Sequence, residues 1–175
     1  MIDLLPYTLV DGIPTMRDSE IMGFYDRMVK DGTADIVMYD DTVTDRESFL
    51  LSMISRGTFF YAIKLKQEVV GLVWLNRIEK KKAYLHFCAF SNIWGKQTKE
   101  IGKVVTEKLI RTKNNGEYLF DIFIGFVPDS NPWAVDYMVQ CGCIAACTIP
   151  NICWNRTKQE SEPGTLIYYI REEDR

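Results

Sequence analysis

The chain has 175 residues, a formal net charge of -3 at pH 7 and an apolar content of 47%. Its length and composition predict one domain spanning residues 1–175 with a single buried core. The charge and the lack of a long basic run argue against nucleic-acid binding, and no apolar run approaches the ~20 residues of a membrane span. The first residues lack the basic and long apolar segments of a secretory signal.

The cysteines indicate the redox environment that the chain is suited to. An odd number of them in apolar, strand-like segments is typical of reduced, buried thiols, so we expect a cytoplasmic protein without disulfides. They are Cys88, Cys141, Cys143, Cys147 and Cys153. The last four contain no C-x2-C pair and the chain has one histidine, so we expect no metal site.

The first part of the chain predicts one strand and two helices. Residues 6–10 (PYTLV) are typical of a short strand. Residues 18–32 carry apolar side chains at helical spacing, with Asp18 or Ser19 as the N-cap and Gly32 after the last turn. Residues 44–57 show a second helical pattern between Thr44 or Asp45 and a glycine.

The middle of the chain changes to the period of strands. The runs TFFYAIKL (58–65) and EVVGLVWLNR (68–77) are separated by two polar residues, which predicts a tight hairpin. The run KKAYLHFCAF (81–90) continues the antiparallel series. These three segments predict a meander that forms one part of a larger sheet.

The rest of the chain alternates between helical and strand patterns. We expect a helix over 94–113, a strand buried on both faces over 117–127, a helix over 129–142 that starts at Asn131 and Pro132, and strands over 143–149 and 166–172 around a polar loop. The order of elements predicts an α/β fold in which one mixed sheet has helices on both faces.

The segment WGKQTKEIG (94–102) opens the predicted central helix with an unusual combination of lysines and a glycine. The first turn of a helix presents unpaired N–H groups and attracts anions, to which Lys96, Lys99 and Lys103 would add charge. Gly102, which costs the helix about 1 kcal/mol relative to alanine, would let an anion reach the main chain. Alternatively, the lysines are merely solvated and the glycine packs closely against a neighbour.

Two segments resemble motifs of the GCN5-related N-acetyltransferases. QTKEIG (97–102) is similar to the [QR]-x-x-G-x-[GA] motif, whose first and last positions are matched by Gln97 and Gly102. NPWAVDYMVQCGC (131–143) is similar to N-x-x-A-x-x-x-Y-x-x-x-G-F at Asn131, Ala134 and Gly142. The resemblance covers about residues 58–171, and it reaches the earlier part of the chain only through the order of elements.

The resemblance implies a GNAT-like fold that binds acetyl-CoA as co-substrate. The strand from Phe87 would run beside the pantetheine arm, the amides around Gln97 would hold the pyrophosphate, and Asn131 would contact the pantetheine from the other side. The cofactor-binding residues that it implies are Phe87, Cys88, Ala89, Phe90, Gln97, Thr98, Lys99, Glu100, Ile101, Gly102, Lys103 and Asn131.

Two positions depart from the family motifs. Glu100 stands where the family has its middle glycine, and a carboxylate 4 Å from one unit of phosphate charge would be repelled by about 4 kcal/mol at an effective dielectric of 20. Met138 stands where many members have the tyrosine that protonates the departing thiolate, and Tyr137 precedes it by one residue, a turn of 100° on a helix. Tyr137 is therefore either the general acid or a packing residue.

His86 is the first candidate for the general base, because an imidazole titrates near neutral pH. On a strand it shares a face with Tyr84 and Cys88; alternatively, it is only a hydrogen-bonded side chain on that face. Cys88, among apolar neighbours, is expected to be inert. Asp121 could face a substrate amine, and TIPNICW (148–154) could line the acceptor cleft or form a packed turn.

Two functions follow from these features. The first is an acyl-CoA-dependent N-acyltransferase that transfers acetyl from acetyl-CoA to a primary amine, on a small molecule, peptide or protein, by direct attack. The second is a non-catalytic binding or assembly protein of the same fold, with a faint resemblance to acetyltransferase-like bacteriophage proteins in IPNICW. A homodimer is compatible with either function.

Overall fold

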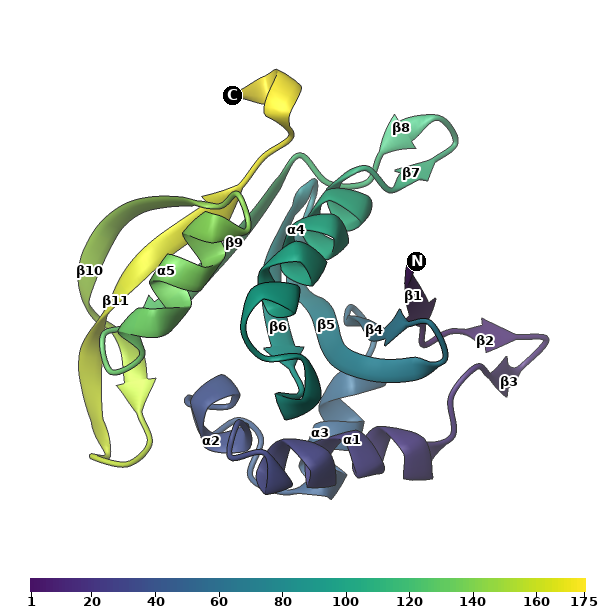
Figure 1. Cartoon of the computed structure of the whole chain (residues 1–175), viewed down its shortest axis with the longest axis horizontal. Coiled ribbons are helices and arrows are strands. Elements are labelled where there is room, and N and C mark those ends of the chain that lie inside the picture. Colours follow the sequence, from purple (N-terminus) through teal and green to yellow (C-terminus); the bar gives the residue numbers. More distant parts are fainter.

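A computed structural model describes residues 1–175, apart from the side chain of Lys96. One seven-stranded mixed sheet organises the chain, in the order β1-β4-β5-β6-β9-β11-β10 (Figure 1). Its strands are β1 (Ile2–Pro6), β4 (Phe59–Leu65), β5 (Glu68–Glu79), β6 (Lys82–Ala89), β9 (Ile122–Pro128), β10 (Ile144–Asn155) and β11 (Glu160–Tyr169). Two small hairpins lie outside it: β2 (Leu9–Val10) with β3 (Ile13–Pro14), and β7 (Lys113–Asn114) with β8 (Glu117–Tyr118).

Strand pairing within the sheet is antiparallel except at its centre. The meander β4–β5–β6 is antiparallel, as the sequence predicts, and so are the pairs β9–β11 and β11–β10. β6 and β9 are parallel, because the chain returns to the same end of the sheet through a helix between them. The predicted mixed α/β sheet is therefore confirmed.

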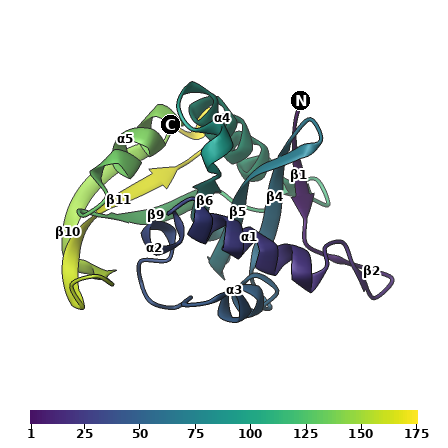
Figure 2. The same cartoon turned by 60° about the horizontal axis from the view of Figure 1, so that its bottom comes forward.

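Helices cover both faces of this sheet (Figure 2). α1 (Asp18–Lys30), α2 (Ala34–Val37) and α3 (Arg46–Met53) lie on one side, and α4 (Lys96–Ile110) and α5 (Pro132–Gln140) lie on the other. Each side buries its own core. One core joins α1 and α3 to side chains such as Phe60 and Trp74, and the other joins α4 to side chains such as Val73 and Phe123.

The helices begin close to the predicted positions. The carboxylate of Asp45 accepts a hydrogen bond from the backbone N–H of Ser48 at 2.7 Å and caps α3, as the residue pattern predicts. α1 instead has Arg17 at its N-cap position, where its N–H donates to the Glu20 carboxylate at 2.9 Å. Asp18 and Ser19 are the first helical residues, so neither of them is the N-cap that the sequence predicts.

Three sequence predictions of strands need correction. The first strand is Ile2–Pro6, and residues 9–14 form a hairpin instead. The expected strand over 117–127 is split, because residues 117–118 pair with residues 113–114 and leave only Ile122–Pro128 in the sheet. The expected polar loop before the last strand is only a turn, because β11 already begins at Glu160. Within β11, the carboxylate of Glu162 accepts hydrogen bonds from the Ser130 hydroxyl and the Asn155 amide.

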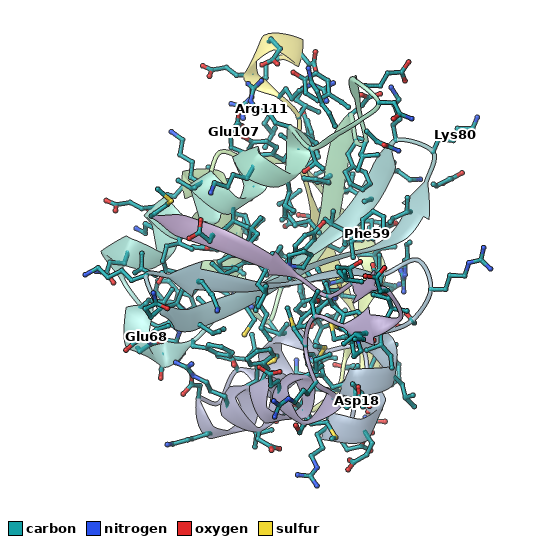
Figure 3. All side chains as sticks on the ribbon, turned by 90° about the vertical axis from the view of Figure 1, so that its right-hand side faces the viewer. Asp18, Phe59, Glu68, Lys80, Glu107 and Arg111 are labelled. Carbon is teal, nitrogen blue, oxygen red and sulfur yellow. The ribbon has the colours of Figure 1, made fainter. Side chains whose placement is uncertain are left out.

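The C-terminal segment is tied to the sheet by two arginines. The buried guanidinium of Arg171 donates to the carbonyl of Phe120 at 2.6 Å and to the carboxylate of Asp121 at 3.1 Å. Asp121 is therefore an ion-pair partner at the start of β9 and not a residue that faces a substrate amine. Arg111, the residue that follows the last turn of α4, bonds both Glu107 and Glu173, and Figure 3 shows Glu107 and Arg111 side by side near the end of the chain. No helix of the described chain is long and apolar enough to cross a membrane.

Candidate functional site

The central parallel strands separate after three residue pairs. Lys82, Ala83 and Tyr84 of β6 lie beside Ile122, Phe123 and Ile124 of β9, and the pairing ends there. Beyond this point β6 stays with β5 while β9 follows β11. The two strands thus open like the arms of a V, and the peptide groups of β6 that face β9 after Tyr84 are left without a partner strand. An extended ligand can use such groups as a strand would.

A cavity of about 540 Å³ lies at this opening. Its walls come from both arms of the V, from α5, from the segment after α2, and from β5 and β10. The aromatic and polar residues of these walls, together with Ile152, include Tyr39, Asp40, Trp74, Asn76, Arg77, Tyr84, His86, Phe87, Phe126, Asn131, Tyr137 and Trp154. This volume and its mixture of aromatic and a few polar side chains suit a small-molecule site. The segment 148–154 supplies Ile152 and Trp154, as one of its two interpretations predicts.

The segment after α2 and the β10–β11 hairpin form one end of the cavity and are held together by Asp41. Its carboxylate accepts from the indole N–H of Trp154 at 3.0 Å and forms an ion pair with Arg156 at 2.9 Å. Next to it, the hydroxyl of Tyr39 donates to the Phe126 carbonyl at 3.4 Å, and burial raises the pKa of Tyr39. Asp40 also lines the cavity, and one oxygen of its carboxylate accepts hydrogen bonds from the backbone N–H and the hydroxyl of Thr42. A protonated amine would find both negative charge and aromatic rings at this end.

His86 lies in the cavity wall just beyond the last β6–β9 pair. Its ring stacks on Trp74, with centroids 5.1 Å apart and planes inclined by 4°, and its Nε2 lies 3.0 Å from the amide oxygen of Asn76. Burial lowers the pKa of His86 to about 4, although Asp40 acts in the opposite direction. The imidazole is therefore neutral at pH 7 and able to accept a proton.

Tyr137 of α5 joins the cavity to the start of α4. Its ring packs on Phe87, with centroids 5.7 Å apart, and its hydroxyl donates to the carbonyl of Thr98 at 3.2 Å. Burial raises the pKa of Tyr137, which makes it a weaker acid. Tyr137 and Met138 both line the cavity. Met138 also packs against the core beneath α4.

Gly102 is packed and not open. A Cβ at this position would lie 2.3 Å from the hydroxyl oxygen of Tyr137 and 2.6 Å from the sulfur of Cys141. The expectation that Gly102 gives an anion access to the main chain is therefore wrong, and the alternative of close packing is correct, with α5 as the neighbour. The cause is the tight approach of α4 and α5, which a side chain on α4 would prevent.

The start of α4 still presents features that suit an anion. Gly95 precedes the helix at φ 100°, a conformation that glycine adopts at little cost. No described side chain caps this end of α4. Gln97, Lys99, Glu100 and Lys103 are exposed, Thr98 is half-buried and Ile101 is buried in the core beneath the helix. The role of this turn in binding pyrophosphate stays a prediction, and Lys96 has no described side chain.

The remaining predicted cofactor residues divide between the cavity and the core. Phe87 and Asn131 line the cavity. The side chains of Cys88 and Phe90 are buried on the opposite side of β6, where Cys88 lies 3.7 Å from the Thr33 hydroxyl and burial raises its pKa to about 11. Ala89 accepts a hydrogen bond from the Trp94 indole through its carbonyl. Only the main chain of 88–90 is therefore suited to contact a cofactor.

Several residues of the cavity were not found from the sequence. Trp74 and Asn76 lie directly across from His86 and Tyr84 in the β5–β6 register, and Asp40 arrives from a segment with no regular pattern. The sequence did contain a signal for Trp74 and Asn76. Residues two apart on a strand lie on one face of the sheet, and so do the residues directly across from them on the paired strand. The position of Asp40 depends on tertiary packing alone.

Comparison with known proteins identifies the architecture. No protein-family model and no curated protein matches the sequence. Among solved structures, spermidine N-acetyltransferase from Vibrio cholerae in complex with CoA and spermine matches with a TM-score of 0.68 and 11% identity, over 97% of this chain and 95% of that chain. Ribosomal-protein-S5-alanine acetyltransferase from Vibrio fischeri matches with a TM-score of 0.69 and 10% identity, over 98% and 93% of the two chains.

A third solved structure holds a different set of ligands. The microcin C7 self-immunity acetyltransferase MccE, in complex with acetyl-CoA and AMP, matches with a TM-score of 0.64 and 14% identity, over 97% of this chain and 92% of that chain. All three proteins are acetyltransferases, and each match extends over nearly the full length of both chains. The chain therefore has the fold of the GCN5-related N-acetyltransferases.

Proposed function

We propose that the protein is an acetyl-CoA-dependent N-acetyltransferase that acts on a primary amine. The observation that carries this proposal is the opening between β6 and β9, with a cavity of about 540 Å³ lined from both strands. In this fold, solved structures hold CoA or acetyl-CoA. The pantetheine would run along the free edge of β6 past Phe87 and Asn131, and the first turn of α4 would hold the pyrophosphate.

The reaction would be a direct transfer between two bound substrates. The amine nitrogen attacks the thioester carbonyl, a C–N bond forms, the C–S bond breaks, and the amine loses one proton to a base. His86, neutral and in the cavity wall, is the base that we propose. The end of the cavity lined by Asp40 and the aromatic side chains would receive the amine.

Binding of acetyl-CoA is tested by thermal unfolding. At 100 times its dissociation constant, a ligand of the folded state adds about 2.7 kcal/mol to the free energy of unfolding, so the melting temperature should rise with acetyl-CoA concentration. Adenosine monophosphate at equal concentration is the control. Release of free thiol in the presence of a panel of primary amines then measures turnover.

A non-catalytic binding protein is the second candidate, and specific residues favour it. Glu100 places a carboxylate in the first turns of α4, and the hydroxyl of Tyr137 is engaged by the Thr98 carbonyl. A rise in melting temperature without thiol release for any amine would support this candidate. If millimolar acetyl-CoA causes no rise, the proposed cofactor is wrong.

A further inference from the structure

Asn76 and His86 form a pair whose geometry specifies where the imidazole carries its proton. The amide oxygen of Asn76 can only accept a hydrogen bond. This oxygen lies 3.0 Å from Nε2 of His86, so with the Asn76 amide in this orientation Nε2 is the ring nitrogen that carries hydrogen. In a neutral imidazole the other nitrogen, Nδ1, then holds a free lone pair.

The surroundings of Nδ1 show that its lone pair is accessible. Every fully buried nitrogen or oxygen of the described side chains has a hydrogen-bond partner. The described chain offers Nδ1 no such partner, and His86 contributes to the cavity lining. Nδ1 is therefore not fully buried, and the space open to it is the cavity.

The ring is also held in a fixed orientation. Trp74 lies directly across from His86 on β5 and stacks on the imidazole with nearly parallel planes. Asn76 comes two residues later on the same strand and the same face, so one strand supplies both the stacking partner and the hydrogen-bond acceptor. Rotation of the imidazole would break both contacts at once.

We propose that Asn76 is a positioning residue that keeps His86 in the Nε2–H form, so that Nδ1 accepts the proton of the acceptor amine. The inference rests on the proposed function. The nitrogen of the amine forms its bond to the acetyl carbon, the C–S bond breaks with its electron pair left on sulfur, and the proton moves from nitrogen to Nδ1. The imidazolium then returns that proton to the CoA thiolate, which leaves His86 neutral again.

The charges around His86 weaken it as a base in the first half of this cycle and favour release of the proton in the second. Asp40, from the segment after α2, raises its pKa, whereas burial and Arg77 of β5 lower it to about 4. Tyr84 of β6 and Tyr39 also line the cavity beside it. An imidazolium with so low a pKa transfers its proton readily to a thiolate, whose conjugate acid has an ordinary pKa of about 8.5. Catalysis then requires no proton from Tyr137.

The single histidine makes a direct test practical, because one imidazole gives all of the histidine NMR signals. Long-range nitrogen–proton correlation spectra at pH 7 should show hydrogen on Nε2 and none on Nδ1. Asn76→Ala should give a mixture of the two forms, and Asn76→Asp should keep the Nε2–H form while raising the pKa of His86. A wild-type spectrum with hydrogen on Nδ1 would overturn the proposal without any measurement of activity.

Turnover provides the second readout. A general base contributes about 10²–10⁴-fold to a rate, so Asn76→Ala should lower kcat by at least about tenfold with an unchanged KM for acetyl-CoA. Asn76→Asp should restore part of kcat and move the acidic limb of the pH–rate profile to higher pH. Asn114→Ala, in the β7–β8 hairpin, is the matched control and should change neither parameter.

The two possible failures can be told apart. If Asn76→Ala binds acetyl-CoA and keeps the wild-type kcat and pH profile, the role of Asn76 is wrong while the proposed function stands. If the wild-type protein shows neither a thermal shift with acetyl-CoA nor turnover, the proposed function fails and the catalytic role of Asn76 fails with it, whatever the spectrum shows.

Discussion

Tyr137 holds the first turns of α4 against α5 through one hydrogen bond and one close contact. Its hydroxyl donates to Thr98 and also occupies the space next to Gly102. Both contacts lie on the route from the cavity to the start of α4. A single side chain thereby sets how closely the two helices approach beside the proposed cofactor site.

Removing this hydroxyl should affect stability more than chemistry. We expect Tyr137→Phe to lower the free energy of unfolding by about 1 kcal/mol, the usual net value of one hydrogen bond, and to change kcat less than threefold, whereas His86→Ala should lower kcat by ~10²-fold or more. Urea unfolding and initial rates measure the two effects. A larger loss of kcat in Tyr137→Phe than in His86→Ala would make Tyr137 the general acid and contradict our assignment.

Adding one methyl group to Gly102 gives a sharper test of the packing. Alanine favours a helix by about 1 kcal/mol over glycine, but the new Cβ would overlap Tyr137 and Cys141, and overpacking typically costs 1–3 kcal/mol. We expect Gly102→Ala to be destabilised on balance. The matched control is Gly23→Ala on α1, where a Cβ meets nothing within 4 Å, and this variant should become more stable.

Chemical denaturation of the two glycine variants separates the explanations. If Gly102→Ala gains as much stability as Gly23→Ala, the close packing of α4 against α5 is refuted. If Gly102→Ala also weakens acetyl-CoA binding, the effect would come from displacement of α5 and not from a blocked anion.

At the scale of elements, α4 is fastened to the last strand of the sheet by Glu107. This carboxylate accepts hydrogen bonds from the hydroxyl of Tyr169 and from Arg111. Burial raises the pKa of Glu107, but these two hydrogen bonds outweigh it, and the pKa lies below its ordinary value. The folded state therefore stabilises the ionised carboxylate.

The sign of this shift defines a pH-dependent prediction. A depressed carboxyl pKa gives stability that is present above the unfolded pKa of about 4.3 and is lost as pH falls through the folded pKa. Glu107→Gln should cost about 1 kcal/mol at pH 7, and the difference from wild type should shrink as pH falls below the unfolded pKa and vanish once the folded carboxyl is protonated. Glu100→Gln, an exposed position on the same helix, is the control and should show no such trend in thermal unfolding.

The elements also show how far sequence reasoning reaches. The meander, α3 with its Asp45 cap, and the helix that starts near Lys96 follow from local periodicity and capping, which depend on neighbouring residues only. The division of 117–127 could not be seen in this way, because the apolar run includes Leu119 and Phe120 although the chain joins the large sheet only at Ile122. His86 was identified by its chemistry, but Asn76 and Asp40 became part of the site only through strand register and packing.

For the whole molecule, the region that ligand binding should change most is the opening between β6 and β9. The peptide groups after Tyr84 and after Ile124 that face the opening have no parallel partner, so their hydrogen exchange is expected to be faster than that of the β4–β5 pair. The alternate groups stay paired with β5 and β11. Acetyl-CoA should slow exchange over residues 85–89 and 125–128 and leave residues 59–65 unchanged. Equal slowing in all three segments, measured by mass spectrometry, would contradict a cofactor in the V.

The short parallel contact of β6 with β9 has a mechanical consequence. Four strands lie on one side of this seam and three on the other, and the main chain joins them through three β6–β9 residue pairs and through the Lys81 carbonyl, which accepts a hydrogen bond from the N–H of Asp121 at 2.8 Å. We expect main-chain hydrogen bonding to resist a rocking motion of the two sub-sheets only weakly, and the core beneath α4, which spans the seam, to resist it more. Such a hinge would change the width of the gap and let a bulky thioester enter and its product leave.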